Sequence, residues 1–318
     1  KNLIFLFISG KYFKINFRLH LLKFGLIKIR VELILTIIIL TVIFILFKKM
    51  NLSFSFVESY ERRLLGRDEI SGVFGYFFNM VTNGLSPLLA YLAFYNRKYF
   101  YFIIPLVYAI LNYGFIGAKA PIAYVFLMST IGIYNSIGGN RTILLLISAV
   151  AGLVLTSFIE LIIFDYSHIG AYFIRRMILV LAQLNMYFLD FIFFYQDSVE
   201  SFFLGNQIPG EIDYLIGEIY YNNRNTNVGT ITFLMELGKR GMIGYLFNIL
   251  FLIILCCFLS YMFRISKHQV WNAISIQYAL LLLGQSYTTA FISSGIGFSI
   301  LMLCLFSYKK ISIKNYKI

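Results

Sequence analysis

The chain has 318 residues, of which 60% are hydrophobic and 13% charged, with a formal net charge of +13. Soluble domains carry about 25% charged residues, so this composition excludes an ordinary soluble protein and predicts one integral membrane domain over residues 1–318. A charge of +13 would suggest nucleic acid as partner of a soluble protein. In a membrane protein it is typical of Lys and Arg gathered on the cytoplasmic side, so we expect the lipid bilayer and no nucleic acid as partner.

Apolar segments long enough to cross a bilayer as helices follow one another along the chain. The run Leu3–Ile8 is too short to cross, so we expect the domain to be incomplete at its N-terminus. Ser86-Pro87 predicts a kink inside one segment, because proline removes a helical hydrogen bond. The predicted spans are Val31–Phe47, Val73–Tyr95, Tyr99–Phe115, Pro121–Tyr134, Thr142–Phe164, Met242–Phe263, Ala273–Ala290 and Ile296–Tyr308.

The sidedness of these spans follows from the charges between them. Short basic connections such as Asn96-Arg97-Lys98 fall on one side of an alternating path, and all acidic residues except Glu32 fall on the other side or at outer helix ends. The long polar stretch 165–240 is therefore predicted to be a large extracytoplasmic loop. Within it, Met177–Tyr195 is apolar but contains Asp190, which favours an interfacial or re-entrant helix over a true span.

Several polar residues of this loop could bind a phosphate or a sugar. Arg175-Arg176 could anchor the loop at lipid headgroups, or could clamp a diphosphate, because guanidinium binds phosphate oxygens bidentately. The amides of Asn225 and Asn227 surround Arg224 and suit sugar hydroxyls. The alternative is an ordinary turn before a helix that begins near Thr226 or Asn227.

Other charged residues have simpler alternatives. Glu236 and Arg240 are four apart on one predicted helix, beside Lys239, and most such pairs are surface ion pairs. Lys119 is either a phosphate contact or a helix-end anchor. Arg62 and Arg63 are expected on a solvated face, and Glu160 and Asp165 could act as a general base or reach the membrane interface.

The loop resembles a known family in its short motifs. Arg175-Arg176, Phe203-Leu204-Gly205, Asn225-Thr226-Asn227-Val228-Gly229 and the run Glu236 to Gly244 are similar to the oligosaccharide repeat unit polymerases, the O-antigen polymerases of the Wzy type. The resemblance implies a metal-independent, cofactor-free membrane glycosyltransferase of the bacterial inner membrane, multi-pass, with its large loop on the periplasmic side. Its expected partners are undecaprenyl-diphosphate-linked oligosaccharide and a chain-length regulator.

The resemblance also implies a fold and a set of site residues. The fold would be an all-α polytopic bundle like that of lipid-dependent membrane glycosyltransferases. Arginines would hold the diphosphate and offset the charge that it gains as leaving group. The implied catalytic positions are Arg175, Arg176, Arg224 and Arg240, and the implied substrate-binding positions are Lys119, Asn225, Asn227, Lys239 and Glu236.

Two other functions remain open from the sequence. An O-antigen ligase would be expected to combine arginine with histidine next to asparagine, whereas His168 lies far upstream of Asn225. A flippase or other transporter for lipid-linked oligosaccharide should place charged residues deep within its spans, and Glu160 lies close to an outer end. Both differences favour the polymerase.

Overall fold

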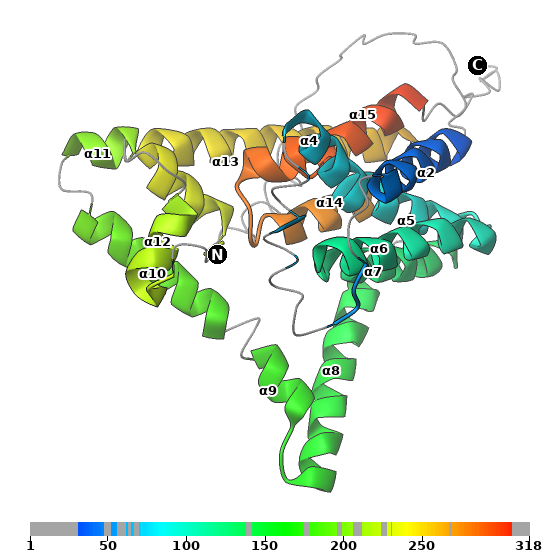
Figure 1. The fold of residues 1–318 in the computed structure, drawn as a ribbon, viewed down its shortest axis with the longest axis horizontal. Helices are drawn as coiled ribbons and strands as arrows, with labels where there is room; N and C mark the ends of the chain where they lie inside the picture. The colour runs from blue at the N-terminus through cyan, green and yellow to red at the C-terminus, as the bar shows by residue number, and fades with distance from the viewer. Residues whose placement is uncertain are drawn as a thin grey trace, which may run out of the picture. The chain divides into compact units, whose positions relative to one another are not determined.

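All regular elements within the described residues are helices (Figure 1), as the sequence predicts. The computed structural model describes residues 31–47, 52–55, 62, 65–66, 70, 72–137, 142–174, 179–195, 199–205, 212–223, 228–229, 231–266 and 269–306. Among them, the three helices Tyr99–Ile116, Ile147–Phe164 and Thr232–Arg264 are long and apolar enough to cross a membrane. This is the architecture of a helical membrane protein, and the full set of eight spans stays a prediction.

The chain divides into two compact units. The first unit comprises Lys1–Gly139, Cys256–Tyr278 and Ala290–Ile318, and the second comprises Asn140–Leu255 and Ala279–Thr289. Helices α13 (Thr232–Ser266) and α14 (Val270–Leu281) contribute residues to both. The other helices of the first unit are α2 (Val31–Phe47), α4 (Gly72–Met80), the π-helical turn η1 (Val81–Leu85), α5 (Ser86–Tyr95), the 3-10 turn η2 (Tyr99–Phe102), α6 (Ile103–Ile116), α7 (Ala120–Ser136) and α15 (Ile296–Phe306).

Close packing of α5 against α7 is the main contact of the first unit. Gly132 of α7 permits it, because a Cβ at this position would lie 2.7 Å from the backbone oxygen of Tyr91. Small residues at helix crossings let backbones approach in this way, which is how helices associate when lipid removes the hydrophobic driving force. Ala90, Ala109 and Val125 fill the core between α5, α6 and α7.

Next to the kink predicted at Ser86-Pro87, the helix contains the π-helical turn η1, which directly precedes α5. Pro87 has no N–H to donate to the backbone oxygen of Asn83, four residues earlier. The side-chain amide of Gln277, which is 1% exposed, donates a hydrogen bond to that oxygen instead. A neighbouring helix thus satisfies the carbonyl that proline leaves without its helical partner, as apolar surroundings require.

The second unit begins with an apolar helical hairpin. Helix α8 (Thr142–Phe164) is followed by the short helix α9 (His168–Ile174), which packs against it (Figure 1). The carboxylate of Glu160 accepts hydrogen bonds from the Ser167 hydroxyl (3.0 Å) and the Ile169 N–H (2.8 Å), and so caps the start of α9. The two roles that the sequence left open for Glu160, a general base or an acid at the membrane interface, stay predictions.

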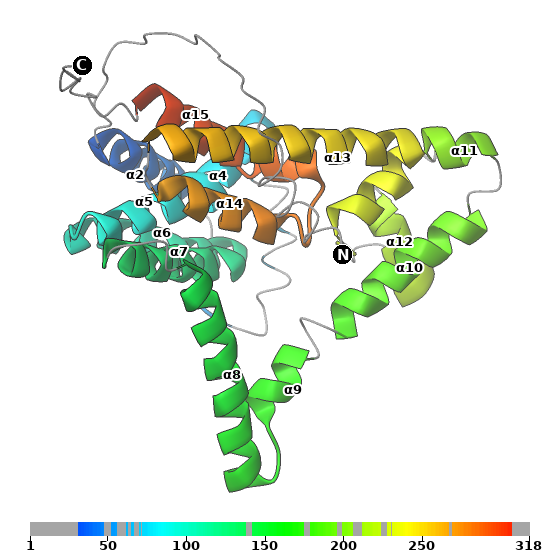
Figure 2. The ribbon, with the colours of Figure 1, turned by 180° about the vertical axis from the view of Figure 1, so that it is seen from behind.

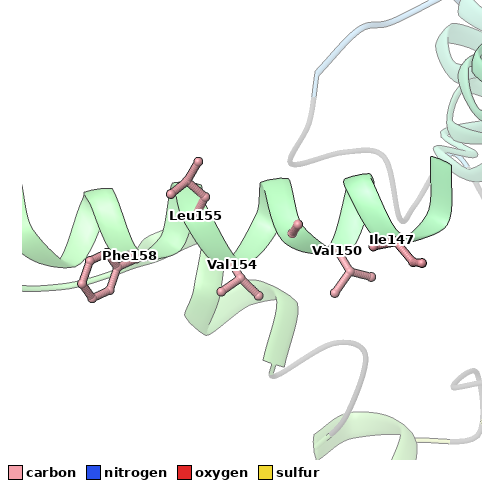
Figure 3. A pocket seen from close by; sticks show the side chains of 6 residues that line it. Ile147, Val150, Val154, Leu155 and Phe158 are labelled. Atoms are coloured by element: carbon pink, nitrogen blue, oxygen red, sulfur yellow. The ribbon is translucent and has the colours of Figure 1, made fainter. Parts of the chain in front are cut away.

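Apolar side chains stay exposed along α8. Residues 147–164 contain no buried side chain, although their mean hydropathy is 2.3. One face forms a shallow apolar groove (Figure 3), lined by Ile147, Val150, Ala151, Val154, Leu155 and Phe158. A helix that is hydrophobic yet uncovered by its own chain suits contact with lipid.

The remaining helices of the second unit carry the polar part of the chain. They are α10 (Val180–Tyr195), α11 (Val199–Leu204) and α12 (Ile212–Tyr221). Phe188 and Phe191 of α10 pack with Ile212 and Ile216 of α12 and with Val228 in a buried cluster. The helix predicted within Met177–Tyr195 is therefore confirmed over Val180–Tyr195, and its interfacial position stays a prediction.

Helix α13 is a hairpin of two arms rather than one straight rod (Figure 2). At Gly241 the backbone leaves the helical conformation, with φ 63° and ψ −160°. The short arm before Gly241 runs back beside the long arm. Two contacts between the arms show this: the Asn248 amide donates to the Thr232 hydroxyl (3.4 Å), and the rings of Phe233 and Tyr245 are 6.0 Å apart. The apolar long arm, from Met242 onward, matches the predicted span Met242–Phe263.

Two predicted boundaries are wrong. The span Ala273–Ala290 is not continuous, since α14 ends at Leu281 and a turn follows it. The helix expected to begin near Thr226 or Asn227 begins instead at Thr232. Val228 is buried, and its N–H donates to the backbone oxygen of Asp213 (3.1 Å), so tertiary packing keeps this stretch out of the helix.

Candidate functional site

Two carboxylate–cation pairs meet in the second unit, on the short arm of α13 and the start of α12. The Arg240 guanidinium donates to Glu236 at 3.0 Å (Nη1 to Oε2), one helical turn away. The Lys239 ammonium donates to Asp213 of α12 at 3.1 Å (Nζ to Oδ2). The pair predicted from the four-residue spacing is thus confirmed, and a second pair ties it to α12.

The two pairs are layered, with acids inside and cations outside. The side chains of Glu236 and Asp213 are 1% and 8% exposed, whereas those of Arg240 and Lys239 are 54% and 29% exposed. A surface ion pair, as the spacing alone suggested, would expose all four groups. The buried carboxylates instead hold the cations in place while much of each cation still faces outward.

A hydroxyl cluster supports Glu236 from the other side. The Ser286 hydroxyl forms a hydrogen bond with the Glu236 carboxylate. Ser286 in turn accepts from the backbone N–H of Thr289 (3.3 Å) and lies 2.9 Å from its hydroxyl. A carboxylate that is taken out of water needs such partners to stay charged, so Glu236 is suited to positioning Arg240 rather than to meeting a ligand itself.

Two glycines with positive φ interlock at the tip of the hairpin. Gly205, just after α11, has φ 85°, and a Cβ there would lie 2.5 Å from the Arg240 Cα. A Cβ on Gly241 would lie 2.5 Å from the Gly205 backbone nitrogen. The Phe203-Leu204-Gly205 motif and the Lys239-Arg240-Gly241 motif, 34 or more residues apart in the sequence, are therefore in backbone contact. Only glycine permits both the backbone conformation and the approach.

The structure brings together three of the predicted site residues, Glu236, Lys239 and Arg240. Lys119 belongs to the first unit, where it is exposed and Gly117, with φ 73°, ends α6 just before it. The other predicted positions, Arg175, Arg176, Arg224, Asn225 and Asn227, lie outside the described residues.

The expectation that Arg62 is solvated is wrong. Arg62 is 9% exposed, and its Nη2 donates to the backbone oxygen of Ser55 at 2.8 Å. Its guanidinium also lies 5.9 Å from the ring centroid of Tyr113. A run of charges in a polar connection predicts solvent exposure, but a planar guanidinium can stack on an aromatic ring and pack inside.

Sequence reasoning missed Asp213 and Ser286. Asp213 lies 26 residues before Lys239, and no helical or strand periodicity links positions that far apart. Ser286 lies four residues before the end of the predicted span Ala273–Ala290, which the structure interrupts after Leu281. Gly241 was a usable signal for a close approach of backbones, because a Cβ there would lie 2.5 Å from the Gly205 backbone nitrogen.

The arrangement is chemically suited to binding an anion. Arg240 presents guanidinium N–H donors beyond the one that Glu236 uses, and Lys239 adds a second positive charge beside it. Among the described residues, no three His, Cys, Asp or Glu side chains gather as a metal ligand set would require. Comparisons with protein-family models, curated proteins and solved structures gave no match.

Proposed function

We propose that this chain polymerises undecaprenyl-diphosphate-linked oligosaccharide repeat units into O-antigen or capsule, at the outer face of the bacterial inner membrane. The growing glycan would pass from its lipid carrier to the end sugar of a newly delivered repeat unit. The bond between the sugar and the diphosphate breaks, a new glycosidic bond forms, and undecaprenyl diphosphate leaves. The proton of the acceptor hydroxyl is lost in the same transfer.

One observation supports this proposal above the others. The partly exposed Arg240 stands at the tip of a helical hairpin whose long arm is apolar. A lipid diphosphate has the same two-part chemistry, with a charged head and a hydrocarbon tail. The head would contact Arg240 and Lys239, and the tail would lie along the apolar helix that begins at Met242.

The cations would act on the leaving group. As the glycosidic bond breaks, negative charge develops on the diphosphate, and fixed cations close to it lower the barrier. Glu236 and Asp213 would position these cations without touching the substrate. The predicted arginines Arg175, Arg176 and Arg224 of the same loop would complete the set.

The test uses cells whose only copy of the gene carries Arg240→Gln, with the amount of protein in the membrane checked. Arg264→Gln is the matched control, because Arg264 is exposed at the far end of the same helix, on the side predicted to be cytoplasmic. We expect Arg240→Gln to reduce the surface polysaccharide to single repeat units on a gel, and Arg264→Gln to leave long chains. Long chains in both variants would refute the proposal, and loss of all repeat units from the surface would favour a flippase or ligase.

A further inference from the structure

A group of tyrosines joins the middle of α10 to the C-terminal end of α12 in the second unit. The rings of Tyr187 and Tyr220 are stacked, with centroids 4.3 Å apart and planes 15° apart. Tyr221 meets Tyr187 edge-on at 5.7 Å and is 43% exposed. We call Tyr187, Tyr220 and Tyr221 the tyrosine patch. The stacked rings of Tyr187 and Tyr220 connect α10 to α12, and much of the Tyr221 ring is exposed.

Hydrogen-bonding groups border this patch. The Gln183 side-chain amide donates to the Tyr187 hydroxyl at 2.5 Å, and the Tyr220 hydroxyl donates to the Asp190 carboxylate. Gln183 is exposed, as are Asn222 and Asn223, which follow Tyr221 directly. Amides and carboxylates next to aromatic rings match a sugar, which has hydroxyls at its edges and an apolar face of C–H groups.

The tyrosine patch and the cation pairs lie at opposite ends of one helix. Asp213, near the start of α12, is bonded to Lys239, and Tyr221 is the last residue of α12. At a rise of about 1.5 Å per residue, the eight steps between Asp213 and Tyr221 span about 12 Å. Helix α12 therefore sets a fixed separation between a group that suits a diphosphate and a group that suits sugar rings.

We propose that the tyrosine patch is a saccharide subsite, which holds sugar rings of the same substrate whose diphosphate contacts Arg240 and Lys239. This inference rests on the proposed function and adds the position of the glycan to it. Helices α10 and α12 contain no Lys or Arg, and Asp190 and Glu218 lie on them. The subsite would thus accept neutral or amino sugars and disfavour uronic acids, because like charges repel.

The ring of Tyr221 fits this role. Partial burial, together with the neighbouring Tyr187, raises the pKa of Tyr221 above its usual value. Its hydroxyl already has the Tyr187 side chain as a hydrogen-bond partner, so the exposed face of the ring is the part of Tyr221 that can meet a sugar. At 43% exposure, much of the Tyr221 ring can be reached from outside the protein.

The test measures binding of two separate probes to the purified full chain in lipid nanodiscs. One probe is the neutral repeat-unit oligosaccharide released by mild acid, free of lipid and phosphate, and the other is farnesyl diphosphate, which has no sugar. Tyr221→Ala should weaken the oligosaccharide affinity by about tenfold and leave farnesyl diphosphate binding unchanged. Arg240→Gln should do the reverse. Tyr166→Ala is the matched control, an exposed tyrosine in the α8–α9 connection, and should change neither affinity.

The outcomes separate this inference from the proposed function. Unchanged oligosaccharide affinity in Tyr221→Ala, or no oligosaccharide binding by the unmodified chain, overturns the saccharide subsite. Farnesyl diphosphate binding that is insensitive to Arg240→Gln overturns the diphosphate contact and with it the proposed function. If Tyr221→Ala does not fold, Tyr221→Trp decides, because it keeps an aromatic face and should retain oligosaccharide binding, whereas Tyr221→Leu should lose it.

Discussion

Replacing Gly241 with alanine should destabilise the second unit strongly. At φ 63° and ψ −160° the residue occupies a region that is essentially restricted to glycine, and forcing another residue there costs about 1–3 kcal/mol. The added Cβ would lie 2.5 Å from the Gly205 nitrogen and 2.6 Å from the Phe202 oxygen. These are backbone atoms, so α11 must shift, at an overpacking cost of about 1–3 kcal/mol. The two effects sum to about 2–6 kcal/mol.

The control is a glycine-to-alanine substitution at a position that has neither a positive φ nor a close backbone contact. Gly152 lies within α8 with no atom within 4 Å of an added Cβ, so Gly152→Ala should be neutral or stabilise by about 0.5–1 kcal/mol. Both variants can be followed by reversible unfolding of the full chain in mixed micelles. The helix content, followed by circular dichroism, reports on unfolding of both units, because the single tryptophan, the buried Trp271, lies in the first unit. A Gly241→Ala protein as stable as Gly152→Ala would refute the interlock between Gly205 and Gly241.

The same unfolding measurement tests the two other predictions. Arg240→Ala should lower the free energy of unfolding by about 3–5 kcal/mol, because it leaves the Glu236 carboxylate buried without its cation. Glu236→Gln should lower it less, because the cation that it leaves is half in water. The opposite order would contradict a site with buried acids and exposed cations. A second variant, Gln277→Leu, should lower the free energy of unfolding by about 1–3 kcal/mol, because it removes the donor to the backbone oxygen of Asn83. In a Pro87→Ala background, where a backbone N–H can reach that oxygen, the cost of Gln277→Leu should be smaller, and equal costs would show that Gln277 does not replace the missing bond.

The helical architecture was predictable because it depends on local properties. Long apolar runs must form helices to satisfy their backbone in lipid, so α8 matches its predicted bounds, Thr142–Phe164, at both ends. An irregular helical turn near Pro87 was also predictable, since the missing N–H is a property of the residue itself. By contrast, Ala273–Ala290 is apolar enough to read as one helix, and only its packing reveals that the helix ends at Leu281.

Part of the candidate site could also be predicted, because it depends on residues close together in the sequence. Glu236 and Arg240 are four residues apart, and any helix through them places them on one face. That spacing does not predict burial, and only the structure shows that the Glu236 carboxylate is buried and the Arg240 guanidinium exposed. The positive-φ glycines Gly205 and Gly241 could be suspected from the sequence, but not that they touch.

What the sequence alone determined is the class of structure and the chemistry available to it, namely a helical membrane protein with cations, amides and tyrosines in one polar stretch. The tertiary structure decided which of these residues meet. Asp213 reaches Lys239, and Asp190 reaches Tyr220, because α10 and α12 pack through a shared apolar core and the chain folds back at Gly241. Such contacts join residues 26 and 30 positions apart, a separation over which hydrophobic periodicity carries no information about proximity.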